Sequence, residues 1–445
     1  MREVRRHRRS SAGYLPALPA LPALFALAGA LAACASNSSY INPPPPQPTK
    51  PKPEEIEATV FLIGDAGEPR PDMARVLETL AADAALRSSP ESDDESRPRI
   101  VFLGDNVYES GFPAGDDPEA YQSAVQRIAP QLEAVGRGGA IGIFTAGNHD
   151  WDRQGPSGWE AIGQQTEYVE SHGALMLPKS GCPGPSVHNI GDRVSLILLD
   201  TQWWLHRGPK PRADGEPPAC DALTQTEVVD QLRAAVDDAS AAGRDVIVAG
   251  HHPLESGGRH GGYWEVSDYF LLPGTAKWIH TIPAILAAGI GITTGAEWLL
   301  GVAVGLQVVP PLAHIYGRKW IASHHQDLSD SWYRAMRDSL RGAFEENPPL
   351  IFAAGHEHNL QVLKGEPEIW NLVSGAGSPA NLSAAKVLDG TICKEVKPGY
   401  MRLDFLRGQE KQVLLTLMAA EGRRPDVGGA LGLRETCRMY LKNQP

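Results

Sequence analysis

The sequence is short of three things: cysteine, net positive charge and long apolar runs. It has 5 cysteines in 445 residues, and no two of them have the C-x-x-C spacing that supports a cysteine-rich zinc site. The formal charge of −12 excludes the basic surface expected of a nucleic-acid-binding protein. The most apolar stretch, 281–312, is interrupted by Glu297, and neither part reaches the roughly 20 residues that a membrane-spanning helix needs.

Two structures fit the apolar stretch 281–312. The one that we favour is a helical hairpin packed on the folded domain. The other is an insertion that dips into a membrane surface and lays the protein against the lipid. A complete crossing is disfavoured, because Glu297 would lie near the middle of the bilayer at a cost of about 2.5–3.5 kcal/mol or more.

The N-terminus has the pattern of an export signal. Five arginines in the first ten residues precede a mostly apolar run that ends at Cys34. The last four residues of this run, LAAC, resemble the lipobox of bacterial lipoproteins, in which the cysteine takes a diacylglycerol. We therefore expect a signal peptide at 1–33 and an exported lipoprotein, anchored through Cys34 in the bacterial cell envelope at the outer membrane or surface. The alternative is an ordinary signal peptide cleaved at an A-x-A-like site.

Composition divides the rest of the chain into a stalk and a domain. Residues 34–57 contain the run PPPPQPTKPKP, which predicts an extended, semi-rigid linker. Residues 58–445 are expected to form one folded domain, in which the apolar stretch is an insertion at about 265–320. Four cysteines remain after Cys34, an even number that suits disulfides in an oxidising compartment. Of their three pairings we expect the local one, Cys182–Cys220 and Cys393–Cys437.

The domain has a repeating pattern of short apolar runs that end at glycine-containing turns. Such runs occur at 59–67, 99–108, 140–150, 193–202, 245–253 and 349–360, and each is rich in Val, Ile, Leu and Phe. They predict buried strands. Helical patterns lie between them, at 71–86, 121–134, 226–242 and 331–344. Strands that alternate with helices predict an α/β fold with a largely parallel sheet.

Polar side chains follow these strands at the point where each ends. Asp65, Asp105 with Tyr108, Asn148 with His149, His251, and His356 with His358 all occupy such turns. In parallel sheets ligands bind beyond the carboxyl ends of the strands, so these side chains should converge. Carboxylate, amide, imidazole and phenol groups suit iron, zinc or manganese, and two adjacent ions are typical of phosphoryl chemistry. One such turn alone would be weak evidence, but the ordered series is specific.

The series of motifs resembles the calcineurin-like metallophosphoesterase superfamily, and within it the small, tartrate-resistant purple acid phosphatases. Most of the superfamily opens with Asp-x-His, but here the residues are Asp65-Ala66-Gly67, so the histidine is absent. Purple acid phosphatases share this loss and carry a tyrosine three residues after the bridging aspartate, as Tyr108 follows Asp105. The resemblance covers 59–265 and 320–405. It implies a four-layer α/β/β/α metallophosphoesterase sandwich, here with an apolar, helical insertion.

The resemblance also implies two metal sites. The first ion, Fe(III), would be held by Asp65, Asp105, Tyr108 and His358, a negatively charged set that suits a trivalent ion. The second, a divalent iron, zinc or manganese ion, would be held by Asp105 as bridge, Asn148, His251 and His356. A metal-activated hydroxide would attack phosphorus, and His149 would protonate the leaving oxygen, a task that His260 would share. His252 is expected to be a bystander, and Asp150 to orient a ligand.

These features predict a phosphatase that hydrolyses small phosphate monoesters at a binuclear Fe(III)–M(II) centre. A phosphodiesterase or nucleotidase on the same scaffold is the alternative enzyme. An alternative of another class is a non-catalytic surface lipoprotein that binds metal or phosphate. The sequence gives no support to that last alternative, since every expected ligand is present.

Overall fold

The central strands bury alternate residues in two different apolar layers. In the computed structural model, Val60 and Leu62 lie in one buried cluster, and Phe61 and Ile63, their neighbours in sequence, lie in another. This period of two is what a strand covered on both faces produces. The first cluster contains residues of both sheets and lies between them, whereas the second contains residues of the helices outside them.

The structure describes residues 48–68, 71–88, 94–212, 220–261, 263, 326–365, 367–378, 382–408, 412–421 and 432–441. All of them belong to one compact unit, Ser39–Pro445. The expected signal peptide, Cys34, most of the linker and the insertion at 265–320 lie outside the described residues. Predictions about those segments therefore stay predictions.

Two seven-stranded sheets form the centre of the unit. The first has the order β14 (Leu433–Leu441), β13 (Val413–Ala420), β12 (Gly399–Leu406), β1 (Ile56–Ile63), β2 (Arg99–Leu103), β3 (Ile141–Thr145), β4 (Leu175–Met176). The second has the order β11 (Thr391–Glu395), β9 (Leu360–Lys364), β10 (Trp370–Ser374), β8 (Ile351–Ala354), β7 (Asp245–Ala249), β6 (Val194–Leu198), β5 (Ser186–Ile190). Each of the six apolar runs in the sequence overlaps one of these strands.

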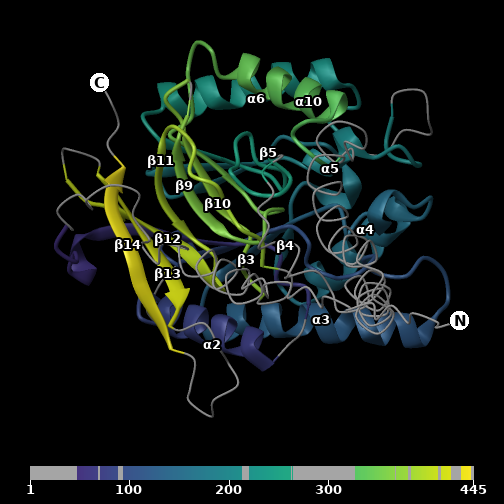
Figure 1. The fold of residues 1–445 in the computed structure, drawn as a ribbon, viewed down its shortest axis with the longest axis horizontal. Coiled ribbons are helices and arrows are strands. Elements are labelled where there is room, and N and C mark those ends of the chain that lie inside the picture. Colours follow the sequence, from purple (N-terminus) through teal and green to yellow (C-terminus); the bar gives the residue numbers. More distant parts are fainter. Residues whose placement is uncertain are drawn as a thin grey trace, which may run out of the picture. The chain divides into compact units, whose positions relative to one another are not determined.

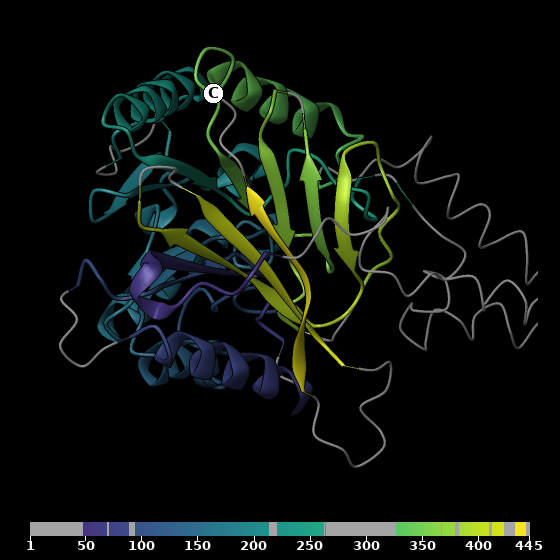
Figure 2. The same ribbon diagram turned by 90° about the vertical axis from the view of Figure 1, so that its left-hand side faces the viewer.

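Helices cover the outer face of each sheet, so that the unit has four layers (Figures 1 and 2). On one side lie α2 (Pro71–Ala85) and α3 (Pro118–Arg137), and on the other α6 (Gln225–Ala241) and α10 (Ser331–Ala343). These are the four helices that the sequence predicts, and three of them begin with a capping side chain; Asp117 caps α3. Thr224 and Glu227 form a capping box at α6, and Asp330 caps α10. The predicted α/β/β/α sandwich is confirmed.

The expectation of a largely parallel sheet is wrong in its extent. Each sheet has three parallel and three antiparallel strand pairs. Five of the six parallel pairs join strands that alternate with helices, since a parallel connection needs a crossover, and the sixth joins β8 to β10 across the intervening β9. Among the described residues, the strands β9 to β14 follow one another with no helix between them, and five of the six antiparallel pairs involve them.

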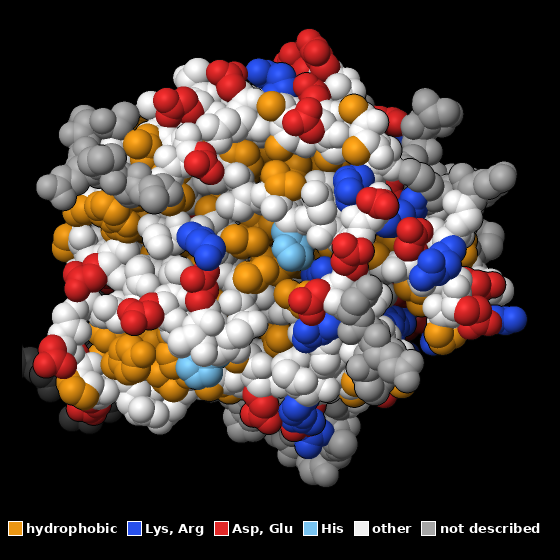
Figure 3. Space-filling view, turned by 180° about the vertical axis from the view of Figure 1, so that it is seen from behind, with side chains coloured by type: hydrophobic (Ala, Val, Ile, Leu, Met, Phe, Trp, Pro, Cys, Tyr) orange, Lys and Arg blue, Asp and Glu red, His pale blue; other side chains and the backbone are white. Residues whose placement is uncertain are grey.

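Both expected disulfides are confirmed, Cys182–Cys220 and Cys393–Cys437. The second joins β11 to β14, which are edge strands of different sheets. It therefore links the two sheets covalently at one end of the sandwich. Among the described residues, no helix is long and apolar enough to cross a membrane. Acidic and basic side chains are interspersed on the face of the molecule shown in Figure 3.

Candidate metal centre

The candidate site is built from the loops that follow β1, β2, β3, β7 and β8. Three of its residues have left-handed backbone conformations that non-glycine residues rarely adopt: Asp65 (φ 57°), Asp105 (φ 55°) and His356 (φ 68°). Such conformations persist only where the surrounding structure enforces them, and they are concentrated at functional sites. The loops are also packed closely together. A Cβ atom at Gly147 would lie 2.2 Å from Asp105 Oδ1, so only glycine fits at this position.

The first group of donor atoms comes from β1, β2 and β8. The Tyr108 hydroxyl lies 3.1 Å from Asp65 Oδ1 and 3.2 Å from His358 Nε2. His358 Nε2 in turn lies 3.3 Å from Asp65 Oδ1. A phenol, a carboxylate and an imidazole thus converge on one point, and Asp105 lies beside them, buried to the same degree as Asp65.

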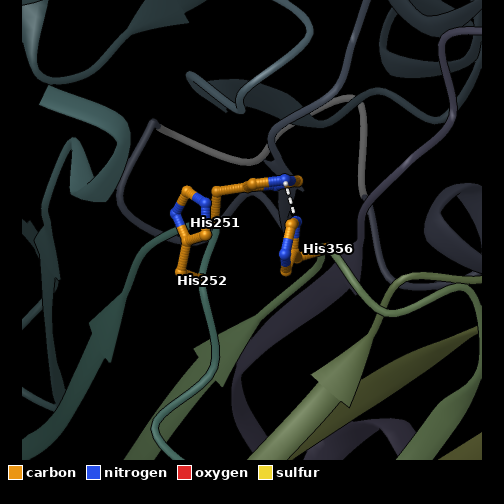
Figure 4. A group of neighbouring side chains, drawn as sticks. All are labelled: His251, His252 and His356. Carbon is orange, nitrogen blue, oxygen red and sulfur yellow. Dashed lines mark hydrogen bonds between the residues drawn. The ribbon is translucent and has the colours of Figure 1, made fainter. Parts of the chain in front are cut away.

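The second group of donor atoms comes from the loops that follow β3, β7 and β8. Its atoms lie as close to one another as those of the first group. Asn148 Oδ1 lies 3.1 Å from His251 Nε2 and 3.0 Å from His356 Nδ1. The two imidazole nitrogens are 3.2 Å apart, and Figure 4 marks this contact with a dashed line between the rings of His251 and His356, whose planes are 73° apart. Asp105 Oδ1 lies 3.5 Å from His251 Nε2, which attaches this group to the first.

Backbone carbonyls fix the tautomers of these two rings. His251 donates Nδ1–H to the carbonyl oxygen of Leu103 at 2.8 Å, and His356 donates Nε2–H to that of Gln326 at 2.8 Å. In the neutral rings, the nitrogens that face Asn148 therefore carry lone pairs. Electron-pair donors about 3 Å apart repel one another unless a cation lies between them. The donor set fits a metal ion.

His252 belongs geometrically to the same cluster but has other partners. Its Nδ1 lies 2.8 Å from Thr201 Oγ1, and its Nε2 lies 2.6 Å from Gln326 Oε1. Both nitrogens are thus engaged, although the residue could be grouped with His251 and His356 by distance alone. His252 holds Gln326 and is not itself positioned as a ligand. Its role is larger than that of the bystander expected from the sequence.

Burial and mutual charge govern the protonation of the site. Burial alone would raise the pKa of Asp105, but the nearby His251 and His149 lower it. Burial, reinforced by the positive charges of neighbouring histidines, lowers the pKa of His356 well below its usual range. Burial and the carboxylates of Asp105 and Asp65 raise the pKa of Tyr108 well above its usual range. Without a strong cation the phenol therefore keeps its proton.

A cavity of about 290 Å³ opens onto these groups, and both predicted acid–base histidines line it. His149 donates Nδ1–H to the carbonyl oxygen of Glu109 at 2.6 Å, and its Nε2 lies 3.9 Å from Asp105 Oδ2. His260 Nδ1 bonds Asp327 Oδ1 at 2.8 Å, and its ring lies 4.1 Å from that of His356. The structure thus brings all nine predicted site residues together.

Asp150 organises the two loops that supply Asp105 and Asn148. Its carboxylate accepts hydrogen bonds from the backbone N–H groups of Asn106, Val107 and Gly147, at 2.8–3.2 Å. This agrees with the orienting role expected from its place after His149. Sequence reasoning missed Gln326, which no neighbouring motif marks, and also Thr201, although it lies in the apolar run at 193–202.

Comparisons with known proteins find solved structures of similar fold but do not assign the chain to a family. No protein-family model matches the chain, and no curated protein matches it. Among solved structures, GAP50, the anchor in the inner membrane complex of Plasmodium, is similar with a TM-score of 0.46 and 12% identity, over 85% of this chain and 88% of that one. A dimetal phosphatase from Danio rerio has a TM-score of 0.43 and 7% identity, over 87% and 99%.

Proposed function

We propose that the chain is a metal-dependent phosphatase that hydrolyses phosphate monoesters at a binuclear Fe(III)–M(II) centre. The observation that carries the proposal is the pair of adjacent donor groups that meet at Asp105. The group of Asp65, Tyr108 and His358 is rich in negative charge and suits a ferric ion. The group of Asn148, His251 and His356 is neutral and suits divalent iron, zinc or manganese.

The bound ions would supply an activated water nucleophile and offset the negative charge of the phosphate oxygens. The protein would supply the proton. Because Nδ1 of His149 is held by Glu109, its Nε2 is the nitrogen left for the cavity, where it can pass a proton to the leaving oxygen. His260 is oriented in the same way by Asp327, whose carboxylate binds its Nδ1.

The experiment that tests this function combines metal analysis with two substrates. We expect purified protein to hold two metal ions, one of them iron, and to hydrolyse para-nitrophenyl phosphate faster than bis(para-nitrophenyl) phosphate. Hydrolysis of the diester alone would show that the protein is a phosphodiesterase and not a phosphomonoesterase. Binding of two ions with turnover of neither ester would favour the metal-binding lipoprotein.

We also propose that this phosphatase acts at the surface of a bacterial membrane on small phosphate esters and not on nucleic acid. The support is the sequence LAAC, which ends at Cys34, and, for a second contact with the membrane, the apolar stretch 281–312. Mass spectrometry of the mature chain should find the mass of a diacylglycerol on Cys34. A mature chain of unmodified mass, free in the medium, would reject the anchor.

A further inference from the structure

Two arginines line the cavity beside the candidate metal ligands. They are Arg153 and Arg259, and they come from loops that are far apart in the chain. Neither is required to hold a metal ion or to donate a proton in the proposed reaction. Their guanidinium groups are planar, permanently charged hydrogen-bond donors, well suited to a carboxylate or phosphate.

Arg153 is held at the cavity by an unusual stretch of backbone. Three consecutive residues, Asp152, Arg153 and Gln154, have left-handed conformations, with φ of 51°, 47° and 79°. The backbone N–H of Arg153 donates to the carbonyl oxygen of Asn148 at 3.0 Å. Since Asn148 is a candidate ligand, this bond fixes Arg153 relative to the metal centre. Three such residues in a row cost energy that a mere surface turn would not require.

Arg259 is held in place through Glu357, the residue between His356 and His358. Glu357 is fully buried, and its Oε1 accepts hydrogen bonds from Ser256 Oγ at 3.0 Å and from the backbone N–H of Gly261 at 2.9 Å. These bonds clasp both ends of the loop 256–261, which carries Arg259. A shift of this loop would therefore disturb His356 and His358, and the loop is fixed relative to the metals.

Arg153 has an exchangeable partner at the cavity. Its Nη1 lies 3.2 Å from Glu109 Oε2, and more than half of each side chain is exposed in this pair. An ion pair in such a position contributes little stability, so a second anion could take the place of Glu109 at small cost. The backbone of Glu109 would stay in place, because its carbonyl oxygen binds His149.

We propose that the cavity selects phosphate monoesters whose leaving group carries a second anionic group, which Arg259 and Arg153 bind while the phosphate lies at the metals. This inference rests on the proposed function and names its substrate class. Because the backbone of Arg153 and the loop that carries Arg259 are tied to ligand-bearing residues, both side chains start from fixed positions beside the metals.

A matched pair of esters tests the inference. For phenyl phosphate and 4-carboxyphenyl phosphate, kcat/KM is measured with the metal-loaded wild type and with Arg259→Gln, Arg259→Lys, Arg153→Gln and Arg207→Gln. Selectivity is kcat/KM for 4-carboxyphenyl phosphate divided by kcat/KM for phenyl phosphate. The selectivity of each variant is compared with that of the wild type, so that the intrinsic reactivity of the two esters cancels. We expect this selectivity to fall about tenfold in Arg259→Gln and roughly threefold in Arg153→Gln, with partial rescue in Arg259→Lys. Arg207→Gln, outside the cavity lining, should leave it unchanged.

Binding separates a failure of the subsite from a failure of the proposed function. The affinities for phenylphosphonate and 4-carboxyphenylphosphonate, which are not turned over, should show the same preference and the same losses. Preferential binding without turnover of either ester would leave the subsite standing and reject the phosphatase. Turnover with equal selectivity in wild type and Arg259→Gln would overturn the subsite alone. A variant that melts early or loses metal is replaced by Arg259→Lys, whose selectivity decides the matter.

Discussion

The imidazole of His356 donates its Nε2–H to the backbone carbonyl oxygen of Gln326 at 2.8 Å. Gln326 is held in turn through its side chain, which bonds His252 Nε2 at 2.6 Å and Gln202 Oε1 at 3.0 Å. The Nδ1 lone pair of His356 therefore points at Asn148 before any ion is present. Partners of this kind orient ligands and tune the affinity of a metal site.

The first prediction concerns this supporting network. His252→Leu removes the partner of Gln326 and leaves every candidate ligand in place. We expect the affinity for the second metal to fall by about 10–100-fold, measured by competition with a chelator. Asn148→Ala, which removes a ligand, should lose that ion altogether, and Asn189→Ala on the exposed side of β5 should change neither ion. Equal affinity in wild type and His252→Leu would contradict the role given to the network.

The second prediction concerns Tyr108. If its phenolate binds Fe(III), the oxidised protein absorbs visible light through charge transfer, and Tyr108→Phe abolishes that absorption. Tyr333→Phe is a matched control, because Tyr333 is also buried but its hydroxyl donates to the carbonyl oxygen of Pro253. That variant should keep its colour. A colourless wild type with zinc in both sites would rule out the ferric assignment.

The third prediction concerns His149 as the proton donor. We expect His149→Asn to lower kcat by roughly 10²–10⁴-fold, with unchanged metal content. The loss should be larger for an alkyl phosphate than for para-nitrophenyl phosphate, because a poor leaving group depends more on protonation. His172→Asn, on the exposed end of α4 (Gly158–Ser171), should behave as wild type. A loss that is the same for both substrates would indicate a structural role.

The fourth prediction concerns stability in acid. Burial, reinforced by the positive charge of Lys210, lowers the pKa of His206 to about 4. The ring is fully buried, and neither of its nitrogens has a hydrogen-bond partner among the described residues. In the unfolded chain this pKa returns to about 6.5. Between these values the unfolded state binds the extra proton, so His206 costs stability as the pH falls from about 6.5 to 4.

Replacing His206 by leucine should remove this part of the pH dependence. The free energy of unfolding, measured with urea at pH 7 and pH 5, should differ less between the two conditions in His206→Leu than in wild type. His172→Gln removes an exposed histidine and serves as the control. If the difference in His206→Leu equals that of wild type, the residue has no such effect.

The residues of the candidate site could be predicted from the sequence more completely than the strands of the two sheets. Each ligand-bearing loop follows a short apolar strand at a glycine, and this local pattern identified Asp65, Asp105, Asn148, His251 and His356 together. The role of Gln326 could not be predicted, because it rests on one backbone carbonyl and a contact between segments far apart in the chain. The strands β9 to β14 were missed for a related reason. No polar motif follows them at a glycine, so the pattern that marked the other strands did not mark these.

The place of β1 in its sheet has a consequence for how the protein matures. This strand leads into Asp65 and lies between β2, which follows soon after it, and β12, which begins at Gly399. A nascent chain that stops short of that point has a row of unpaired peptide groups along β1, the strand that leads into Asp65. We therefore expect a product truncated before β12 to aggregate, because one edge of β1 stays open, and to bind metal ions more weakly than the full chain.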